Sequence, residues 1–126
     1  MASNAVRENV THSGSANSPV VHWWYQRLTA AALVPLSLWL LVFLNKAMNL
    51  PYIETSAWLI SPVNLVAIAA WSLVVIYHAA LGVQVVIEDY VSTVPVRQLA
   101  IRASNLIFLI LGVAALAALI IILTTN

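Results

Sequence analysis

The chain has 126 residues, of which 63% are hydrophobic and 7% are charged, and its formal net charge is +1. Charged residues make up about a quarter of an ordinary soluble domain, so this composition excludes that class and predicts a membrane protein. The chain has no cysteine, which excludes thiolate metal sites, iron–sulfur ligation by this chain, covalent c-type haem attachment and disulfides. A net charge this small also argues against a nucleic-acid partner.

Residues 1–22 are predicted to form a polar N-terminal tail. The tail lacks the basic segment and apolar core of a secretory signal. Arg7 is its only arginine, which is too few for a transit peptide. These features favour a bacterial chain whose first membrane helix inserts by itself, and therefore a protein of the bacterial inner (cytoplasmic) membrane.

Residues 23–126 are predicted to form a three-helix membrane domain. Apolar runs predict helices over about 28–48, 63–89 and 103–123, each close to the roughly 20 residues that cross about 30 Å of hydrocarbon. Pro35 is expected to kink the first of these helices. The predicted fold class is therefore an all-α membrane protein with three transmembrane helices and short connections.

The basic residues indicate how the chain is oriented. Arg7, Arg27, Arg97 and Arg102 fall in the tail and around the second connection, whereas the first connection holds only Lys46. Because basic residues accumulate on the cytoplasmic side, this bias places the N-terminus in the cytoplasm and the C-terminus outside. Aromatic residues next to the predicted helices are typical of interfacial anchors at these boundaries.

His78 is the only ionisable residue near the middle of any apolar run. Such a group is costly in hydrocarbon, so it marks a functional site by default. Two interpretations are open. His78 can ligate a haem iron as a neutral imidazole, or it can be a packing residue hydrogen-bonded to a Ser, a Thr or a backbone carbonyl of a neighbouring helix. His12 and His22 lie in or before the headgroup region, so a second haem ligand would come from another subunit.

Gly82 and Asp89 share the helix face of His78, because steps of four and eleven residues return to nearly the same direction. Gly82 lowers the helix surface on that face. Either another backbone or a planar macrocycle can therefore approach closely there.

The second helix is predicted to end with Glu88 and Asp89, followed by Tyr90. Acids are disfavoured at the C-terminal end of a helix dipole, so a basic partner, a water chain or a role in proton delivery would explain them. The alternative is a pair of solvated carboxylates. Tyr90 brings a phenol hydroxyl to the membrane boundary, where it can donate a hydrogen bond to a quinone or serve as an interfacial anchor.

Arg27 lies directly before the predicted first helix, on the same side of the membrane as Tyr90. Its forked donors suit a carboxylate such as a haem propionate. An arginine at this position can also set the topology of the chain while its side chain snorkels to the interface.

Three short motifs of the chain resemble one family when they are taken together. They are Gln26-Arg27-Leu-Thr29-Ala30 before the first apolar run, and His78-x-x-x-Gly82 and Glu88-Asp89-Tyr90-Val91 on the second helix. In this combination the chain resembles the hydrophobic membrane-anchor subunit of succinate dehydrogenase, and more narrowly the smaller, D-type anchor of a bacterial four-subunit complex II. The resemblance covers almost the whole membrane portion.

This resemblance implies a membrane anchor of succinate:quinone oxidoreductase that catalyses nothing alone. A haem b would be shared with a C-type cytochrome b anchor subunit, with His78 as an axial ligand of the iron, Arg27 at a propionate and Gly82 within the cofactor site. Tyr90 would hydrogen-bond ubiquinone, with Asp89 beside it. FAD and iron–sulfur clusters would belong to a flavoprotein subunit and an iron–sulfur subunit.

Two other functions remain open. The anchor of a quinol:fumarate reductase shares this architecture, and the direction of turnover depends on the quinone and on the soluble subunits. A haem-free structural or assembly subunit would use His78 only for helix packing. A proton-coupled transporter is disfavoured, because three helices are few and the polar groups form no chain across the bilayer.

Overall fold

The computed structural model describes residues 18–125, and these residues form four α-helices. The helices are α1 (Ser18–Asn49), α2 (Tyr52–Leu59), α3 (Pro62–Tyr90) and α4 (Val94–Thr125). Helices α1, α3 and α4 are each long and apolar enough to cross a membrane. The predicted all-α fold with three transmembrane helices is therefore confirmed, and the chain is a multi-pass membrane protein.

The long helices extend beyond the apolar runs that predicted them. The first part of the predicted tail, with Arg7 and His12, lies outside the described residues, but positions 18–22 belong to α1. Similarly, α4 begins at Val94, well before its apolar run. Hydropathy detects only the part of a helix that lies in hydrocarbon, whereas the backbone hydrogen bonds of the helix continue through polar positions.

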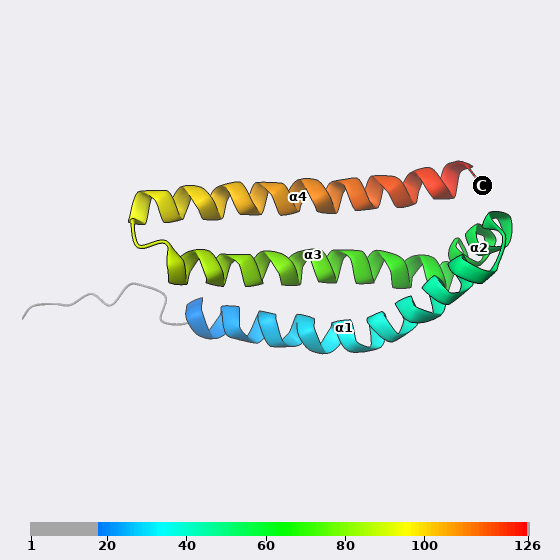
Figure 1. The fold of residues 1–126 in the computed structure, drawn as a ribbon, viewed down its shortest axis with the longest axis horizontal. Coiled ribbons are helices and arrows are strands. Elements are labelled where there is room, and N and C mark those ends of the chain that lie inside the picture. The colour runs from blue at the N-terminus through cyan, green and yellow to red at the C-terminus, as the bar shows by residue number, and fades with distance from the viewer. Residues whose placement is uncertain (1–17, 126) are drawn as a thin grey trace, which may run out of the picture.

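The three long helices lie side by side, with α3 in the middle (Figure 1). Helices α1 and α4 both pack on α3, and α2 contacts α1 and α3 at one end of the layer. The start of α1, the end of α3 and the start of α4 lie together at the opposite end. Arg27 and Tyr90 are therefore near the same membrane boundary, as the sequence predicted.

Helix α1 contains Pro35 and bends in its second half toward α2 (Figure 1). Proline has no backbone N–H, so it cannot donate to the carbonyl four residues earlier, and its ring crowds that carbonyl. A bend in this helix is the result expected from the sequence.

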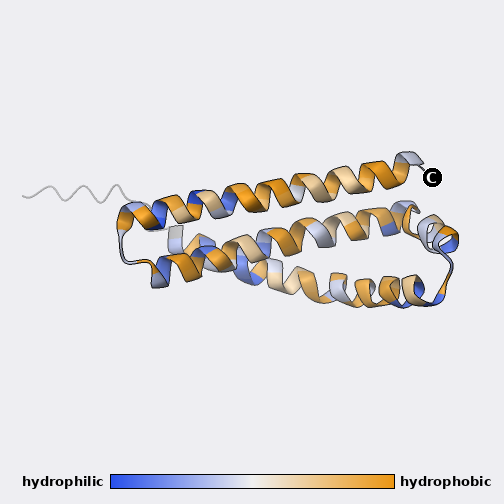
Figure 2. Ribbon diagram, turned by 45° about the horizontal axis from the view of Figure 1, so that its top comes forward, coloured by the Kyte–Doolittle hydropathy of each residue, from blue (hydrophilic) through white to orange (hydrophobic). Residues whose placement is uncertain are grey.

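The layer has almost no interior of its own. Among the described residues, the buried ones are Leu59 and Leu81, with the polar Thr55 and Ser56. Apolar residues run along the whole length of the three long helices (Figure 2), and most large apolar side chains are exposed. A surface of this kind is covered by lipid or by other protein chains in a membrane.

Helix α2, which was not predicted, is fixed to its neighbours at the end of the layer that also holds the C-terminus. The rings of Trp39, Phe43 and Trp58 are nearly parallel, with centroids 5.8–6.2 Å apart. Asn64 accepts a hydrogen bond from Trp39 Nε1 at 3.0 Å and donates one to the Trp58 carbonyl oxygen at 2.9 Å. These contacts join α1, α2 and α3, so they set the relative position of the two helices that carry the candidate site.

Candidate functional site

His78 on α3 is held by Thr29 on α1. Its Nδ1 atom lies 2.8 Å from Thr29 Oγ1, and both side chains are partly buried in the interface between the two helices. Thr29 Oγ1 also lies 2.8 Å from the carbonyl oxygen of Tyr25 and 3.1 Å from that of Gln26. The hydroxyl has a single proton to donate, and the two carbonyls can only accept.

One arrangement of protons satisfies the contacts of Thr29 together. In it, Thr29 donates to a backbone carbonyl and its oxygen accepts the proton of His78 Nδ1. In that arrangement Nε2 is the ring nitrogen left for another partner, and no hydrogen bond to it forms within the described residues. Metal-ligating histidines are oriented in the same way, by donating their other ring N–H to a nearby acceptor. A packing role accounts for the Thr29 contact but leaves Nε2 without a partner.

Gly82 lies one turn beyond His78 and faces α1. A β-carbon built at Gly82 would lie 3.7 Å from Gln26 Nε2, which is an ordinary contact distance. The Gln26 amide therefore lies against α3 at Gly82, and the β-carbon of an alanine would also fit there at an ordinary contact distance. The sequence did not decide which group approaches Gly82. Within the described chain, that group is the side-chain amide of Gln26.

A strip of polar side chains runs along the same face of α1. His22, Gln26 and Thr29 are separated by four and three residues, so they lie on one side of the helix. His22 Nε2 and Gln26 Oε1 are buried without a hydrogen-bond partner among the described residues. Buried polar atoms are nearly always satisfied, so these two atoms require a water, a ligand or a neighbouring chain.

Arg27 lies on a different face of α1 from Thr29. Its guanidinium carbon lies 4.1 Å from the centroid of the Trp23 ring, in a cation–π contact. Within residues 18–125, Arg27 forms no hydrogen bond or ion pair with α3. This chain alone therefore does not bring Arg27 and His78 together.

Asp89 and Tyr90 end α3 and are exposed, Tyr90 by 84%. No hydrogen bond to either side chain forms within the described residues, so both can engage another molecule at the membrane boundary. Glu88 differs, because its Oε1 accepts a hydrogen bond of 2.8 Å from Gln84. Asp89 lies about 16 Å along the helix axis from His78, on nearly the same face.

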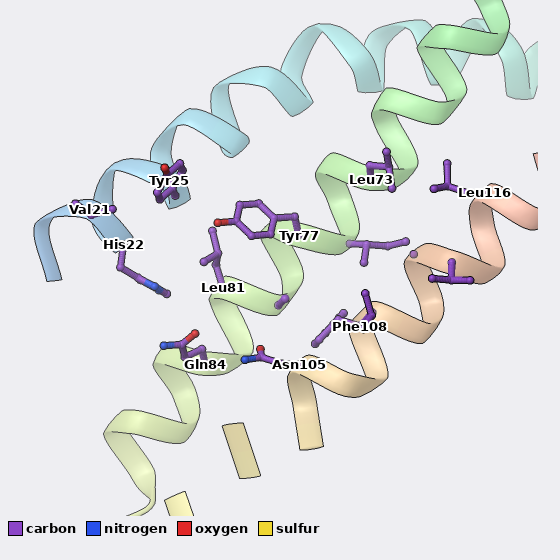
Figure 3. Close-up of a pocket in the computed structure, with 15 residues that line it drawn as sticks. Val21, His22, Tyr25, Leu73, Tyr77, Leu81, Gln84, Asn105, Phe108 and Leu116 are labelled. Carbon is purple, nitrogen blue, oxygen red and sulfur yellow. The ribbon is translucent and has the colours of Figure 1, made fainter. Parts of the chain in front are cut away.

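A cleft of about 770 Å³ opens between α1, α3 and α4 on another side of α3 (Figure 3). His78 does not line this cleft. Its polar lining residues are His22, Tyr25, Tyr77, Gln84 and Asn105. The other ten lining residues are apolar or glycine, and the cleft was not predicted from the sequence.

The chain matches the family model of the succinate dehydrogenase/fumarate reductase transmembrane subunit over residues 3–122. The chain belongs to this family. It is 41% identical over 108 residues to the succinate dehydrogenase hydrophobic membrane anchor subunit of Rickettsia bellii, covering 85% of this chain and 86% of the relative. The subunit of the same name from Rickettsia conorii is 38% identical over 109 residues, covering 86% of each chain.

The succinate dehydrogenase membrane anchor subunit of Reclinomonas americana is 32% identical over 88 residues, covering 67% of this chain and 72% of the relative. No solved structure matches the chain significantly. The resemblance to succinate dehydrogenase membrane anchors that the sequence motifs indicated is thus confirmed.

The contacts of two residues, Thr29 and Gln26, were not predicted from the sequence. Thr29 belongs to a recognised motif, but its contact with His78 was not assigned. Gln26 was likewise only part of that motif, whereas the structure has its amide against Gly82. The spacing of His22, Gln26 and Thr29 is the signal that would have indicated a polar helix face. Among the described residues, no group of three or more His, Cys, Asp or Glu side chains is placed to hold a metal ion, so a metal would need ligands from elsewhere.

Proposed function

We propose that this chain is the membrane anchor subunit of a succinate:quinone oxidoreductase, in which it helps to hold a haem b and to bind ubiquinone. The observation that carries the proposal is the contact between Thr29 and His78, which leaves His78 Nε2 bare near the middle of a transmembrane helix. Family membership supports the anchor role. The family description also covers fumarate reductases, but the relatives named above are succinate dehydrogenase subunits, which favours succinate oxidation.

His78 would hold the haem iron through Nε2, and a second ligand would come from a C-type cytochrome b anchor subunit. The donor fits this role, because a neutral imidazole with its Nδ1 proton donated to Thr29 is a suitable ligand for haem iron. Gly82 keeps the helix surface low next to the ligand. Arg27 pairs with a propionate at the membrane boundary. When bound, the haem supplies a one-electron redox centre within the membrane.

Tyr90 donates a hydrogen bond to a ubiquinone carbonyl, and Asp89 lies beside it as a source of hydrogen bonds or protons. Both residues are exposed at the end of α3, where a quinone headgroup can reach them from the bilayer. A flavoprotein subunit with FAD and an iron–sulfur subunit dock on this side of the membrane. The side is cytoplasmic, because the basic residues are concentrated there, and the membrane is the bacterial inner membrane.

The experiment that tests this function is the purification of the complex through a tag on this chain. Co-purifying subunits are identified by mass, and a reduced-minus-oxidised visible spectrum is recorded. We expect a flavoprotein, an iron–sulfur subunit, a second membrane anchor and a b-type haem spectrum. If the complex lacks haem, the chain would be a structural anchor only. If the complex reduces fumarate with quinol much faster than it oxidises succinate, the chain would be the anchor of a quinol:fumarate reductase.

Replacing Thr29 by valine should weaken haem binding. Valine keeps the shape of the side chain but cannot accept the proton of His78 Nδ1, and loss of such an outer contact typically lowers metal affinity about 10- to 100-fold. Haem content per complex would be measured during detergent dialysis. The midpoint potential would be measured by redox titration. Thr29→Ser should restore both values. The control is Ser72→Ala, since within residues 18–125 the Ser72 hydroxyl donates only to Ile68 O of its own helix. Equal haem retention in the Thr29→Val and Ser72→Ala complexes would contradict the proposed role of Thr29.

Replacing Arg27 by leucine should shift the midpoint potential of the haem or loosen the haem. A propionate that loses its charged partner stabilises the oxidised iron more strongly, so the expected shift is toward lower potential. Redox titration of the assembled complex measures it. Arg97→Leu is the control, because it removes a basic residue from the same boundary. A normal potential combined with reduced membrane insertion would instead assign Arg27 to topology.

A further inference from the structure

The cleft between α1, α3 and α4 changes in polarity along its length. His22, Gln84 and Asn105 lie at one end, and Leu73 and Leu116 lie at the other (Figure 3). The polar end is the one nearer the start of α1, the end of α3 and the start of α4, where the helices reach the membrane boundary (Figure 1). The cleft is therefore shaped for an amphiphile that enters the bilayer with its polar part at that boundary.

The apolar end of the cleft is empty enough to take a chain. A β-carbon added at Gly112 would meet no heavy atom of another described helix within 4 Å. The cleft volume of about 770 Å³ is within the roughly 300–1,000 Å³ that is usual for small-molecule sites. Leu73 and Leu116 lie at this end of the cleft (Figure 3), so it offers apolar contacts.

The polar end carries groups that suit a lipid ester and a phosphate. His22 Nε2 is buried without a partner among the described residues, and Asn105 lines the same cleft with an amide that can donate to a carbonyl oxygen. Arg102 is exposed and precedes Asn105 by three residues, so it lies on the same side of α4 and one turn nearer the membrane surface. A guanidinium at this depth matches a phosphate group.

From these features we infer that the cleft binds a membrane phospholipid. One acyl chain lies along Leu81 toward Gly112 and Leu116, the ester carbonyl accepts hydrogen bonds from His22 and Asn105, and the phosphate pairs with Arg102. A quinone would share the apolar tail and the carbonyl chemistry, but it carries no anion for Arg102. The site is separate from His78 and Tyr90, so the inference stands whether or not this chain binds haem.

The test measures the phospholipid that stays with the purified complex after exhaustive exchange into a lipid-free detergent. Gly112→Leu places a side chain in the cleft, where a β-carbon has open space, and we expect loss of the retained phospholipid, detected by extraction and mass spectrometry. The matched control is Ala114→Leu, which adds the same side chain two positions away, on the opposite and exposed side of α4. Equal phospholipid in the Gly112→Leu and control complexes would overturn the inference.

A second measurement uses the unchanged complex, so it does not depend on how a variant folds. A phospholipid with a photoactivatable acyl chain is exchanged into the complex, excess lipid is removed, and the cross-linked peptides are identified. Cross-links to the cleft-lining parts of α3 and α4 are expected, and weaker retention of the probe in Arg102→Gln would agree with the phosphate contact. Recovery of a quinone instead of the phospholipid, or of a cross-link from a partner subunit that fills the cleft, would overturn the inference.

Discussion

Replacing His78 by alanine should abolish or strongly perturb the b-type haem spectrum of the purified complex. Among the described residues, His78 is the imidazole near the middle of the transmembrane helices, and its Nδ1 lies 2.8 Å from Thr29 Oγ1, which leaves Nε2 for the proposed ligation. Without the imidazole, the proposed site would lose the ligand that this chain supplies, so the haem should be lost or its spectrum should change. A reduced-minus-oxidised spectrum, with haem quantified per complex, measures the effect.

Two controls separate ligand loss from misfolding. His78→Gly leaves a space in which added imidazole can bind, and recovery of the low-spin spectrum on adding imidazole would show that only the ligand was missing. Electron transfer from succinate to a soluble artificial acceptor should remain in either variant, because it depends on the soluble subunits. A spectrum and haem content that do not change in His78→Ala would remove His78 from the haem site and leave it as a packing residue bonded to Thr29.

The number and approximate position of the transmembrane helices could be predicted because the thickness of the hydrocarbon sets the length of an apolar run. The ends of the helices could not. Ser18 and Val94 begin α1 and α4 well outside the apolar runs, where backbone hydrogen bonding and not side-chain hydropathy decides whether the helix continues. The short helix α2 was missed for a related reason, because eight residues are too few to show a clear periodicity.

The depth of His78 could be read from the sequence, but its partner could not. Whether Thr29 or another side chain of α1 faces His78 depends on how the two helices are rotated and shifted against each other. That geometry follows from packing, including the contact between Trp39 and Asn64 at the far end. A cleft between α1 and α4 depends in the same way on the spacing of two helices that are separated by α3.

The large exposed apolar surface explains why the candidate site is incomplete within this chain. Arg27 stacks on Trp23 of its own helix, and the side chains of Asp89 and Tyr90 have no hydrogen-bond partner among the described residues. Each of these groups can act only on a molecule that this chain does not enclose. An exposed apolar surface of this extent is covered by lipid or by other chains in a membrane, and partners for these groups would come from there.

Replacing Tyr90 by phenylalanine should lower ubiquinone reduction much more than electron transfer to a soluble artificial acceptor. The substitution removes only the hydroxyl, so packing at the end of α3 is kept. Loss of a hydrogen bond to a substrate carbonyl that is withdrawn from water costs about 1–3 kcal/mol, and each 1.4 kcal/mol is about a factor of ten. Steady-state assays of the complex with a short-chain ubiquinone and with a soluble acceptor give the two rates.

The matched control is Tyr52→Phe, because Tyr52 is also exposed, by 73%, but lies at the opposite end of the helical layer. It tests whether loss of any tyrosine hydroxyl at a membrane boundary disturbs the complex. We expect its quinone reductase activity to match that of the unchanged complex. Equal losses in both assays for Tyr90→Phe, or equal losses of quinone reduction in the two variants, would make Tyr90 an interfacial anchor. A selective loss would mean that the Tyr90 hydroxyl engages the quinone, since the phenyl ring of the variant would still occupy the boundary but could donate no hydrogen bond.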